Sequence, residues 1–189
     1  MSRAGSARLL EFRGGRHCAR SALGRLGLTG TPVLRASDRA PVWPEGFVGS
    51  IAHTRSRERG FCGAAVARAA EVRSVGLDVE RDEPLARNLW QRVLTAGEQA
   101  RIEEKPESEQ GFWGKLVFSA KECAYKCQYP LSRQFLEFAD VEVTISEERS
   151  ELFAALLRDA GPFRGGTVFA GRFTRQGGII ATGMTLFAG

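Results

Sequence analysis

Two carboxylates stand one residue apart in the apolar segment SVGLDVE at 74–80. In a β-strand, side chains at i and i+2 leave the same face about 6–7 Å apart, so Asp78 and Glu80 would point together. Such a pair of carboxylates suits Mg²⁺, which is usually coordinated by one or two protein carboxylates together with phosphate and water oxygens. An edge strand with a solvated polar face is the alternative interpretation. The apolar run before the pair and the acidic residues after it favour a cation site.

A second charged group lies in FSAKECAYK at 118–126, within a segment of helical periodicity. Glu122 and Lys126 are four residues apart and share a helix face, as do Lys121 and Tyr125. Glutamate before lysine at this spacing is also a common surface ion pair, which contributes only about 0.2–0.5 kcal/mol. Only four of the 27 basic residues of the chain are lysines, so residues 121 and 126 stand out as positions suited to a compact ammonium group.

Further basic and hydrogen-bonding side chains precede both groups. Arg8 and Arg16 lie on the basic face of a helix predicted at 7–28, and His53 ends an apolar segment that also contains Ser50. A solvated helix face and a structural histidine are the simpler interpretations. Joined to three carboxylates and two ammonium groups, these residues would form a site for Mg²⁺ and a phosphate-ester polyanion.

The periodicity of the chain predicts how these groups are positioned. Residues 85–129 are expected to be mostly helical, with a loop at 103–111 and a stop at Pro130, and segment 151–158 fits either a helix or a strand. A helix followed by strands occurs twice, which places a lobe boundary near 82–86. The predicted strands are 47–53, 61–70, 72–79, 139–145, 167–174 and 178–187.

Composition excludes several classes of protein. The 189 residues are 43% hydrophobic and 26% charged, and no apolar run approaches the ~20 residues that span a bilayer. The N-terminus has no apolar core of a secretory signal, so a cytoplasmic protein is expected. Four cysteines without a CxxC pair and only two histidines indicate free thiols rather than a zinc site. The net charge of +5 implies an anionic partner.

Four segments in this order resemble the 4′-phosphopantetheinyl transferases of the enterobactin-synthetase component D type: EFRGGRHCARSAL (11–23), PVWPEGFVGSIAH (41–53), SVGLDVE (74–80) and FSAKECAYKCQYPL (118–131). The resemblance implies a monomeric α/β (α+β) fold of two pseudo-twofold lobes, each a small sheet packed with helices. Residues 1–83 would bind the nucleotide of coenzyme A, and residues 84–189 would carry the metal and the catalytic helix. Family members usually have a further segment before the first motif, which ten residues precede here.

The resemblance also implies an activity. The 4′-phosphopantetheine arm of coenzyme A would pass to a serine of an acyl or peptidyl carrier protein of a polyketide, fatty acid or nonribosomal peptide synthase, releasing adenosine 3′,5′-bisphosphate. Asp78, Glu80 and Glu122 would hold Mg²⁺ or Mn²⁺, with Glu122 as the base, directly or through a metal-bound water. Lys121 and Lys126 would face the pyrophosphate as catalytic cations. The coenzyme A contacts would be Arg8, Arg16, Arg35, Ser50, His53, Asp78, Lys121 and Tyr125.

The arginine-rich segment TRSRERG at 54–60 is a possible contact for an acidic carrier protein. Two other function classes were weighed. A metal-dependent nuclease predicts a carboxylate-x-lysine pair on one strand, which neither EVRS nor KECAYK supplies. A basic nucleic-acid-binding module predicts arginines gathered among aromatic residues, whereas the arginines here are spread along the chain. The sequence therefore favours a transferase with neither a nucleic-acid nor a membrane partner.

Overall fold

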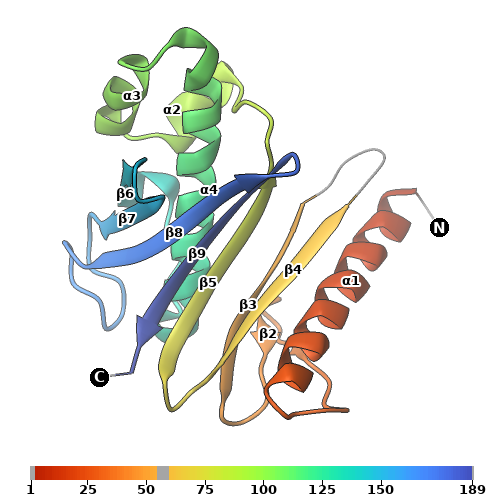
Figure 1. Ribbon diagram of the computed structural model, residues 1–189. Helices are drawn as coiled ribbons and strands as arrows, with labels where there is room; N and C mark the ends of the chain where they lie inside the picture. Colours follow the sequence, from red (N-terminus) through yellow and green to blue (C-terminus); the bar gives the residue numbers. More distant parts are fainter. Residues whose placement is uncertain (1–2, 55–59, 189) are drawn as a thin grey trace.

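The computed structural model describes residues 3–54 and 60–188, with the side chains of residues 3–8 also outside the description. Helices and strands are mixed along the chain, which confirms the predicted α/β class. Two unequal lobes lie side by side, a small N-terminal lobe and a larger C-terminal lobe (Figure 1). Within the described residues, no helix has both the length and the apolar character needed to span a membrane.

The N-terminal lobe is a β-hairpin covered by one long helix. Strands β3 (Phe47–Thr54) and β4 (Phe61–Arg68) pair antiparallel, and α1 (Arg3–Arg25) packs along them (Figure 1). The helix ends before Gly27, whose φ of 91° suits a glycine. A short pair, β1 (Leu34–Arg35) and β2 (Pro41–Val42), follows the helix. The fully buried core here is small, comprising Ala19, Leu23 and Val33.

The C-terminal lobe is built on a five-stranded antiparallel sheet with the order β5-β9-β8-β7-β6. Its strands are β5 (Val72–Arg81), β6 (Val141–Ser146), β7 (Glu151–Leu156), β8 (Val168–Gln176) and β9 (Ile179–Phe187). The ambiguous segment 151–158 is thus a strand, because its alternate residues pack into the core. Two short helices, α2 (Trp90–Val93) and α3 (Ala96–Glu103), and the 3-10 turns η1 (Arg87–Leu89) and η2 (Phe138–Asp140) complete the lobe.

Helix α4 (Glu107–Ser132) packs on the sheet and differs from the prediction at both ends. It begins directly after Pro106, inside the segment expected to be a loop, and it continues two residues past Pro130. A proline in the last turn leaves most of the helical hydrogen bonds intact, and Arg133 ends the helix in the left-handed conformation with φ 55°. Its buried apolar residues follow helical spacing: Trp113, Leu116, Val117, Ala120, Cys123, Ala124 and Cys127.

Strand β5 belongs by hydrogen bonding to the larger sheet, since it pairs with β9 along its length. The predicted lobe boundary at 83–84 therefore falls after this strand rather than before it. Side chains of β5 alternate between two environments. Leu77 and Val79 lie near Gly63 of the hairpin, whereas Ser74 and Asp78 hydrogen-bond residues of α4.

Gly76 is the point of closest approach between β5 and α4. A Cβ at this position would lie 2.2 Å from the carbonyl oxygen of Cys123, a distance that real Cβ atoms essentially never reach. The absence of a side chain thus lets the helix lie against the strand. Cys123 and Cys127 are buried free thiols at this contact, and burial raises the pKa of Cys127 to about 11. The expectation that these cysteines are free thiols is confirmed for both.

Candidate active site

Asp78 and Glu80 face α4 from neighbouring positions on one side of β5. Asp78 is only 3% exposed, and it accepts hydrogen bonds from Ser119 at 2.8 Å and from Lys126 at 2.5 Å. Glu80 forms an ion pair with Lys115 at 3.4 Å. Burial raises the pKa of Glu80, and the negative charge of Asp78 raises it further. The pair predicted from its i, i+2 spacing is therefore turned toward the helix that carries the other motif.

Glu122 approaches the same pair from α4. Burial raises the pKa of Glu122, Lys126 opposes that shift, and Asp78 adds to it. Lys126 thus interacts with an acidic group of the strand, Asp78, through an ion pair and with an acidic group of the helix, Glu122, through its charge.

The three carboxylates offer only hard oxygen atoms, which is the donor type that Mg²⁺ prefers. Among residues 3–54 and 60–188, however, no three Asp, Glu, His or Cys side chains gather closely enough to hold an ion. Both Asp78 oxygens are engaged, one by Ser119 and the other by Lys126. The carboxylate oxygens of these residues are therefore of the type that binds Mg²⁺. To coordinate one ion together, the three side chains would have to rearrange.

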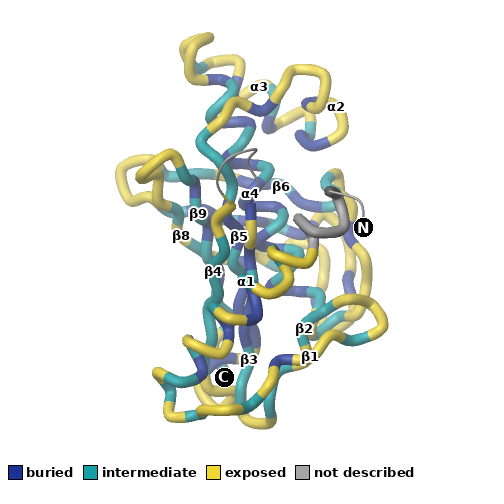
Figure 2. The backbone as a smooth tube through the Cα atoms, turned by 90° about the vertical axis from the view of Figure 1, so that its right-hand side faces the viewer, coloured by how far each residue is buried: buried dark blue, intermediate teal, exposed yellow. Residues whose placement is uncertain are grey.

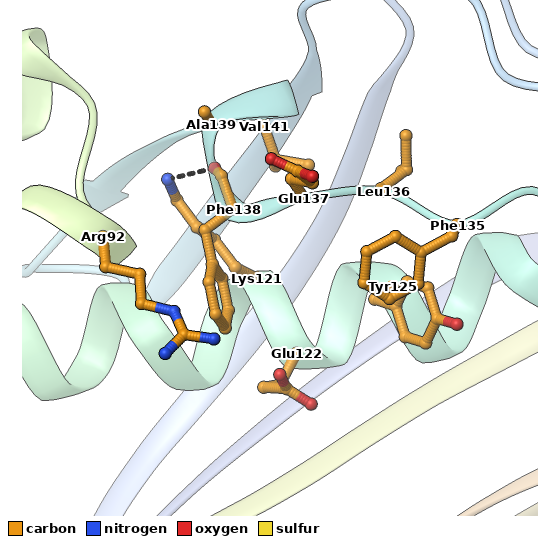
Figure 3. A pocket seen from close by; sticks show the side chains of 10 residues that line it. All are labelled: Arg92, Lys121, Glu122, Tyr125, Phe135, Leu136, Glu137, Phe138, Ala139 and Val141. Carbon is orange, nitrogen blue, oxygen red and sulfur yellow. Dashed lines mark hydrogen bonds between the residues drawn. The ribbon is translucent and has the colours of Figure 1, made fainter.

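Lys121 does not face this carboxylate group, and the prediction that both motif lysines face one opening is wrong for it. Its side chain is 1% exposed, and its ammonium group pairs with Glu98 at 2.7 Å. The same group donates to the carbonyl oxygens of Val93 at 2.9 Å and Phe138 at 2.7 Å. Figure 3 shows Lys121 and Glu122 pointing away from each other. Adjacent residues of a helix diverge by about 100°, which separates their roles.

The Lys121–Glu98 pair joins three parts of the lobe. Glu98 caps α3 by accepting from the backbone of Thr95 at 2.7 Å, and it accepts from the backbone of Val143 in β6 at 2.7 Å. Burial raises the pKa of Glu98 and lowers that of Lys121, while their mutual attraction opposes both shifts. Lys121 is consequently a structural anchor between α4, α3 and the segment before β6.

A pocket of about 400 Å³ lies beside Glu122, between α4, the end of α2 and the segment before β6 (Figure 3). We call it the α4 pocket. Its walls are mainly apolar, with Tyr125 and Phe135 at one end and Arg92 at the other (Figure 3). The remaining lining residues are Lys121, Leu136, Glu137, Phe138, Ala139 and Val141. A long, narrow and partly apolar ligand would suit this shape.

A second pocket, of about 490 Å³, lies between the two lobes. This interlobe pocket is lined by the loop at 36–43 and by β3 on one side, and by α4 on the other. Lys126 and Tyr125 both contribute to its wall, so Tyr125 lines both pockets. Asp38 of the loop accepts from the Tyr129 hydroxyl at 2.9 Å, which holds the loop to α4. The predicted binding residue Tyr125 thus forms part of the wall of each pocket.

The predicted basic residues Arg16 and Arg35 come together on the N-terminal lobe, at a hollow of about 270 Å³ that Arg13 and Arg20 also line. Arg16 is 8% exposed, and its Nε atom is buried without a hydrogen-bond partner among the described residues. Burial lowers the pKa of Arg16, and the positive charge of Arg35 lowers it further. An anion bound here would satisfy that donor and relieve the repulsion.

The other predicted contacts lie apart from one another. Ser50 faces β5, where its hydroxyl accepts from the Leu77 amide at 3.0 Å, although Ser50 also lines the interlobe pocket. His53 is exposed, and strand alternation places it on the opposite face of β3 from Ser50. The Arg8 side chain and residues 55–59 of the arginine-rich segment lie outside the described residues.

Sequence reasoning missed Glu98, Ser119 and Lys115. The Thr95-x-x-Glu98 spacing is a recognisable capping box. Because capping is a sufficient reason for a glutamate at this position, the sequence gives no sign of its ion pair with Lys121. Ser119 lies within the quoted helical motif, three residues before Glu122, so helical spacing alone could have placed it on the strand-facing side. Lys115, which pairs with Glu80, could have been singled out because the chain has only four lysines.

Carboxylates of β5 and α4, the ammonium group of Lys126 and two pockets that share Tyr125 thus lie on helix α4 and the elements packed against it. The described fold agrees with two family models. The 4′-phosphopantetheinyl transferase N-terminal domain matches residues 1–67, and the 4′-phosphopantetheinyl transferase superfamily matches residues 74–168. The chain belongs to the 4′-phosphopantetheinyl transferase superfamily, and the resemblance read from its motifs is confirmed.

Proteins similar to this chain include two that are named as 4′-phosphopantetheinyl transferases. The chain is 38% identical to the 4′-phosphopantetheinyl transferase Svp of Streptomyces mobaraensis, over all of this chain and 76% of that protein. It is 31% identical to the 4′-phosphopantetheinyl transferase PptT of Mycobacterium tuberculosis, over 98% of this chain and 82% of that protein. A shorter match, 30% identical over 65% of the chain, is to enterobactin synthase component D of Salmonella typhi, of which it covers 49%. The protein is therefore an enzyme of this transferase class.

Proposed function

We propose that the enzyme transfers the 4′-phosphopantetheine arm of coenzyme A to a serine of an acyl or peptidyl carrier protein. The carriers would belong to polyketide, fatty acid or nonribosomal peptide synthases, and adenosine 3′,5′-bisphosphate would be released. One observation supports this most directly. Lys126, which pairs with Asp78, lines the interlobe pocket, Glu122 lines the apolar α4 pocket, and Tyr125 lines both.

Coenzyme A has two unlike halves, and the two pockets differ in the same way. The pantetheine arm is long and weakly polar, which suits the α4 pocket with its largely apolar walls. The nucleotide half is aromatic and anionic, which suits the interlobe pocket and the arginines of the N-terminal lobe. Arg16 and Arg35 would take its 3′-phosphate, because Arg16 has a buried donor to satisfy. The pyrophosphate between the halves would then lie near Lys126 and Glu122.

Residues of β5 and α4 would supply the chemistry. Asp78, Glu80 and Glu122 would hold Mg²⁺ or Mn²⁺, which neutralises charge on the pyrophosphate when bound. Glu122 would accept the proton of the serine hydroxyl as its oxygen attacks the phosphorus that carries the arm. The bond from that phosphorus to the bridging oxygen breaks, and the nucleotide leaves with the bonding electrons. Lys126 would stabilise the charge that develops on the leaving phosphate.

Mass measurement on the carrier tests the proposal. The enzyme is incubated with coenzyme A, Mg²⁺ and several apo carrier proteins, and the mass added to each carrier is recorded. We expect the mass of the phosphopantetheine arm on at least one carrier. Asp78→Asn and Glu122→Gln should lower kcat by about a hundredfold or more, because each removes a charge that the reacting group requires.

Glu148→Gln is the matched control, since Glu148 is an exposed residue of the turn after β6 and its change removes the same charge. That variant should keep the activity of the parent enzyme. An unchanged mass on every carrier, or full activity of the Asp78 and Glu122 variants, would contradict the proposal. Removal of divalent cations with a chelator should abolish transfer, and added Mg²⁺ should restore it.

A further inference from the structure

Arg92 is a cation at the end of the α4 pocket. It is exposed, and among the described residues it forms neither an ion pair nor a hydrogen bond. Two carboxylates, Glu122 and Glu137, line the same pocket, and among the described residues neither forms an ion pair with Arg92. A guanidinium group in a mainly apolar pocket is suited to bind an anion.

The backbone of Arg92 is held firmly in place. Its neighbours Trp90 and Val93 are 3% and 4% exposed, so α2 is anchored on both sides of the arginine. The carbonyl oxygen of Val93 accepts from Lys121 at 2.9 Å, which ties the end of α2 to α4. The guanidinium group therefore stays near the pocket, even though its side chain is free to turn.

The position of Arg92 along the pocket identifies what it would meet. Tyr125 lines both pockets, so a ligand that spans them must pass at that end. Arg92 stands at the other end, beyond Lys121 and Phe138 (Figure 3). On the proposed function, the arm would enter near Tyr125 and its sulfur-bearing end would lie toward Arg92.

A free thiol is a poor partner for a guanidinium group, because sulfur is a weak acceptor. A carboxylate attached through the sulfur would accept strong, charge-assisted hydrogen bonds. We propose that Arg92 makes the enzyme select coenzyme A thioesters of short dicarboxylic acids over thioesters of neutral acids. This inference rests on the proposed function and names the substrate class for the same site.

The transfer reaction itself is unchanged by the acyl group. The serine oxygen forms its bond to the phosphorus, the bridging oxygen leaves with the nucleotide, and the serine proton passes to Glu122. The thioester bond is neither formed nor broken. The carrier would therefore receive an arm that is already loaded with its acidic acyl group.

Competing donors test the inference. The kcat/KM values are measured with malonyl- and succinyl-coenzyme A, with acetyl- and butyryl-coenzyme A as neutral references of similar size, and the mass of each product is recorded. We expect the acidic donors to be preferred by about tenfold, the effect of one hydrogen bond between charged groups. In Arg92→Gln the preference should fall to about one. Arg149→Gln, which removes the same charge from an exposed turn, should keep the preference.

Calorimetry of succinyl-coenzyme A and coenzyme A binding to the parent enzyme and Arg92→Gln gives a readout independent of turnover. Equal affinity of the parent for both ligands, or a preference that survives in Arg92→Gln, would overturn the inference. So would a uniform rise in the KM for the carrier protein with every donor, which would place Arg92 against the carrier instead. Failure to transfer the arm from coenzyme A itself would contradict the proposed function, while the calorimetry would still decide the role of Arg92.

Discussion

The two lobes of the enzyme handle charge in opposite ways. In the C-terminal lobe, buried charges are paired, as in Lys121 with Glu98 and Lys126 with Asp78. In the N-terminal lobe, Arg16 is nearly buried, yet one of its nitrogens has no partner and Arg35 repels it. Paired charges fix the arrangement of side chains before a substrate binds. Unpaired cations instead store an unfavourable energy that an anionic ligand can relieve.

The packing of the lobes follows the same division. Buried apolar residues extend through α4 and the five-stranded sheet, whereas β4 has no fully buried position and much of α1 is exposed (Figure 2). The well-packed lobe carries Asp78, Glu80 and Glu122, and the lightly packed lobe carries Arg16 and Arg35. We therefore expect substitutions in the first to change stability and activity together, and substitutions in the second to change mainly ligand affinity.

The largest effect is expected from Glu98→Ala in the well-packed lobe. This change leaves the Lys121 ammonium group buried without its counter-ion, which typically costs about 3–5 kcal/mol. Urea unfolding followed by fluorescence measures the loss. The double variant Glu98→Leu/Lys121→Met should be much less destabilised, because it removes both charges. A loss below about 1 kcal/mol in the single variant would show that the ion pair is not a structural anchor.

Gly76→Ala should have the next largest effect. The added methyl group would push the backbone of Cys123 away from β5, at a cost of about 1–3 kcal/mol, and would displace Glu122 from Asp78. Both the midpoint of thermal unfolding and the transfer rate should fall. Gly183→Ala on β9 is the control, since position 183 pairs with Leu77 and a Cβ there meets no atom within 4 Å. Equal behaviour of the two variants would argue against a close-packing role for Gly76.

Arg16→Gln should separate affinity from stability in the lightly packed lobe. Loss of hydrogen bonds from a charged group should weaken coenzyme A binding by about 1.5–3 kcal/mol. The free energy of unfolding should change little, because the variant also removes a buried donor that lacks a partner. Calorimetry with coenzyme A and with 3′-dephospho-coenzyme A checks both points. A variant that loses stability but binds both ligands normally would contradict the contrast between the lobes.

The smallest effect is expected from Asp38→Asn at the contact between the lobes. Asp38 is exposed and accepts from Tyr129 at 2.9 Å and from Arg133 at 3.3 Å. Exposed pairs contribute little, so the KM for coenzyme A should rise by about twofold while kcat stays constant. Steady-state kinetics with a saturating carrier protein measures this. A fall in kcat would indicate that the loop at 36–43 also affects the chemical step.

Local spacing predicted the parts of the site that lie on single elements. The i, i+2 pair of Asp78 and Glu80 and the i, i+4 pair of Glu122 and Lys126 follow from strand and helix periods. The role of Lys121 could not be predicted in this way, because its partner Glu98 is 23 residues away and is brought to it by packing. Spacing gives the direction of a side chain, but only the tertiary fold gives its partner.

The fold was predictable to a similar degree. Strands with clear apolar patterns were predicted, and segment 151–158 stayed ambiguous because a short apolar run fits both the helix and the strand period. Pro130 misled the prediction because its cost depends on its place in the helix, and in the last turn few hydrogen bonds are lost. The membership of β5 in the larger sheet depended on its pairing with β9, about a hundred residues later, which no local pattern encodes.

Strand β5 presents Leu77 and Val79 to the hairpin and Asp78 and Glu80 to α4. Side chains of a strand exchange faces when its register moves by one residue. A single insertion or deletion just before Asp78 would therefore turn both carboxylates toward the hairpin and Val79 toward the helix. The number of residues in this strand thus matters to the site as much as their types.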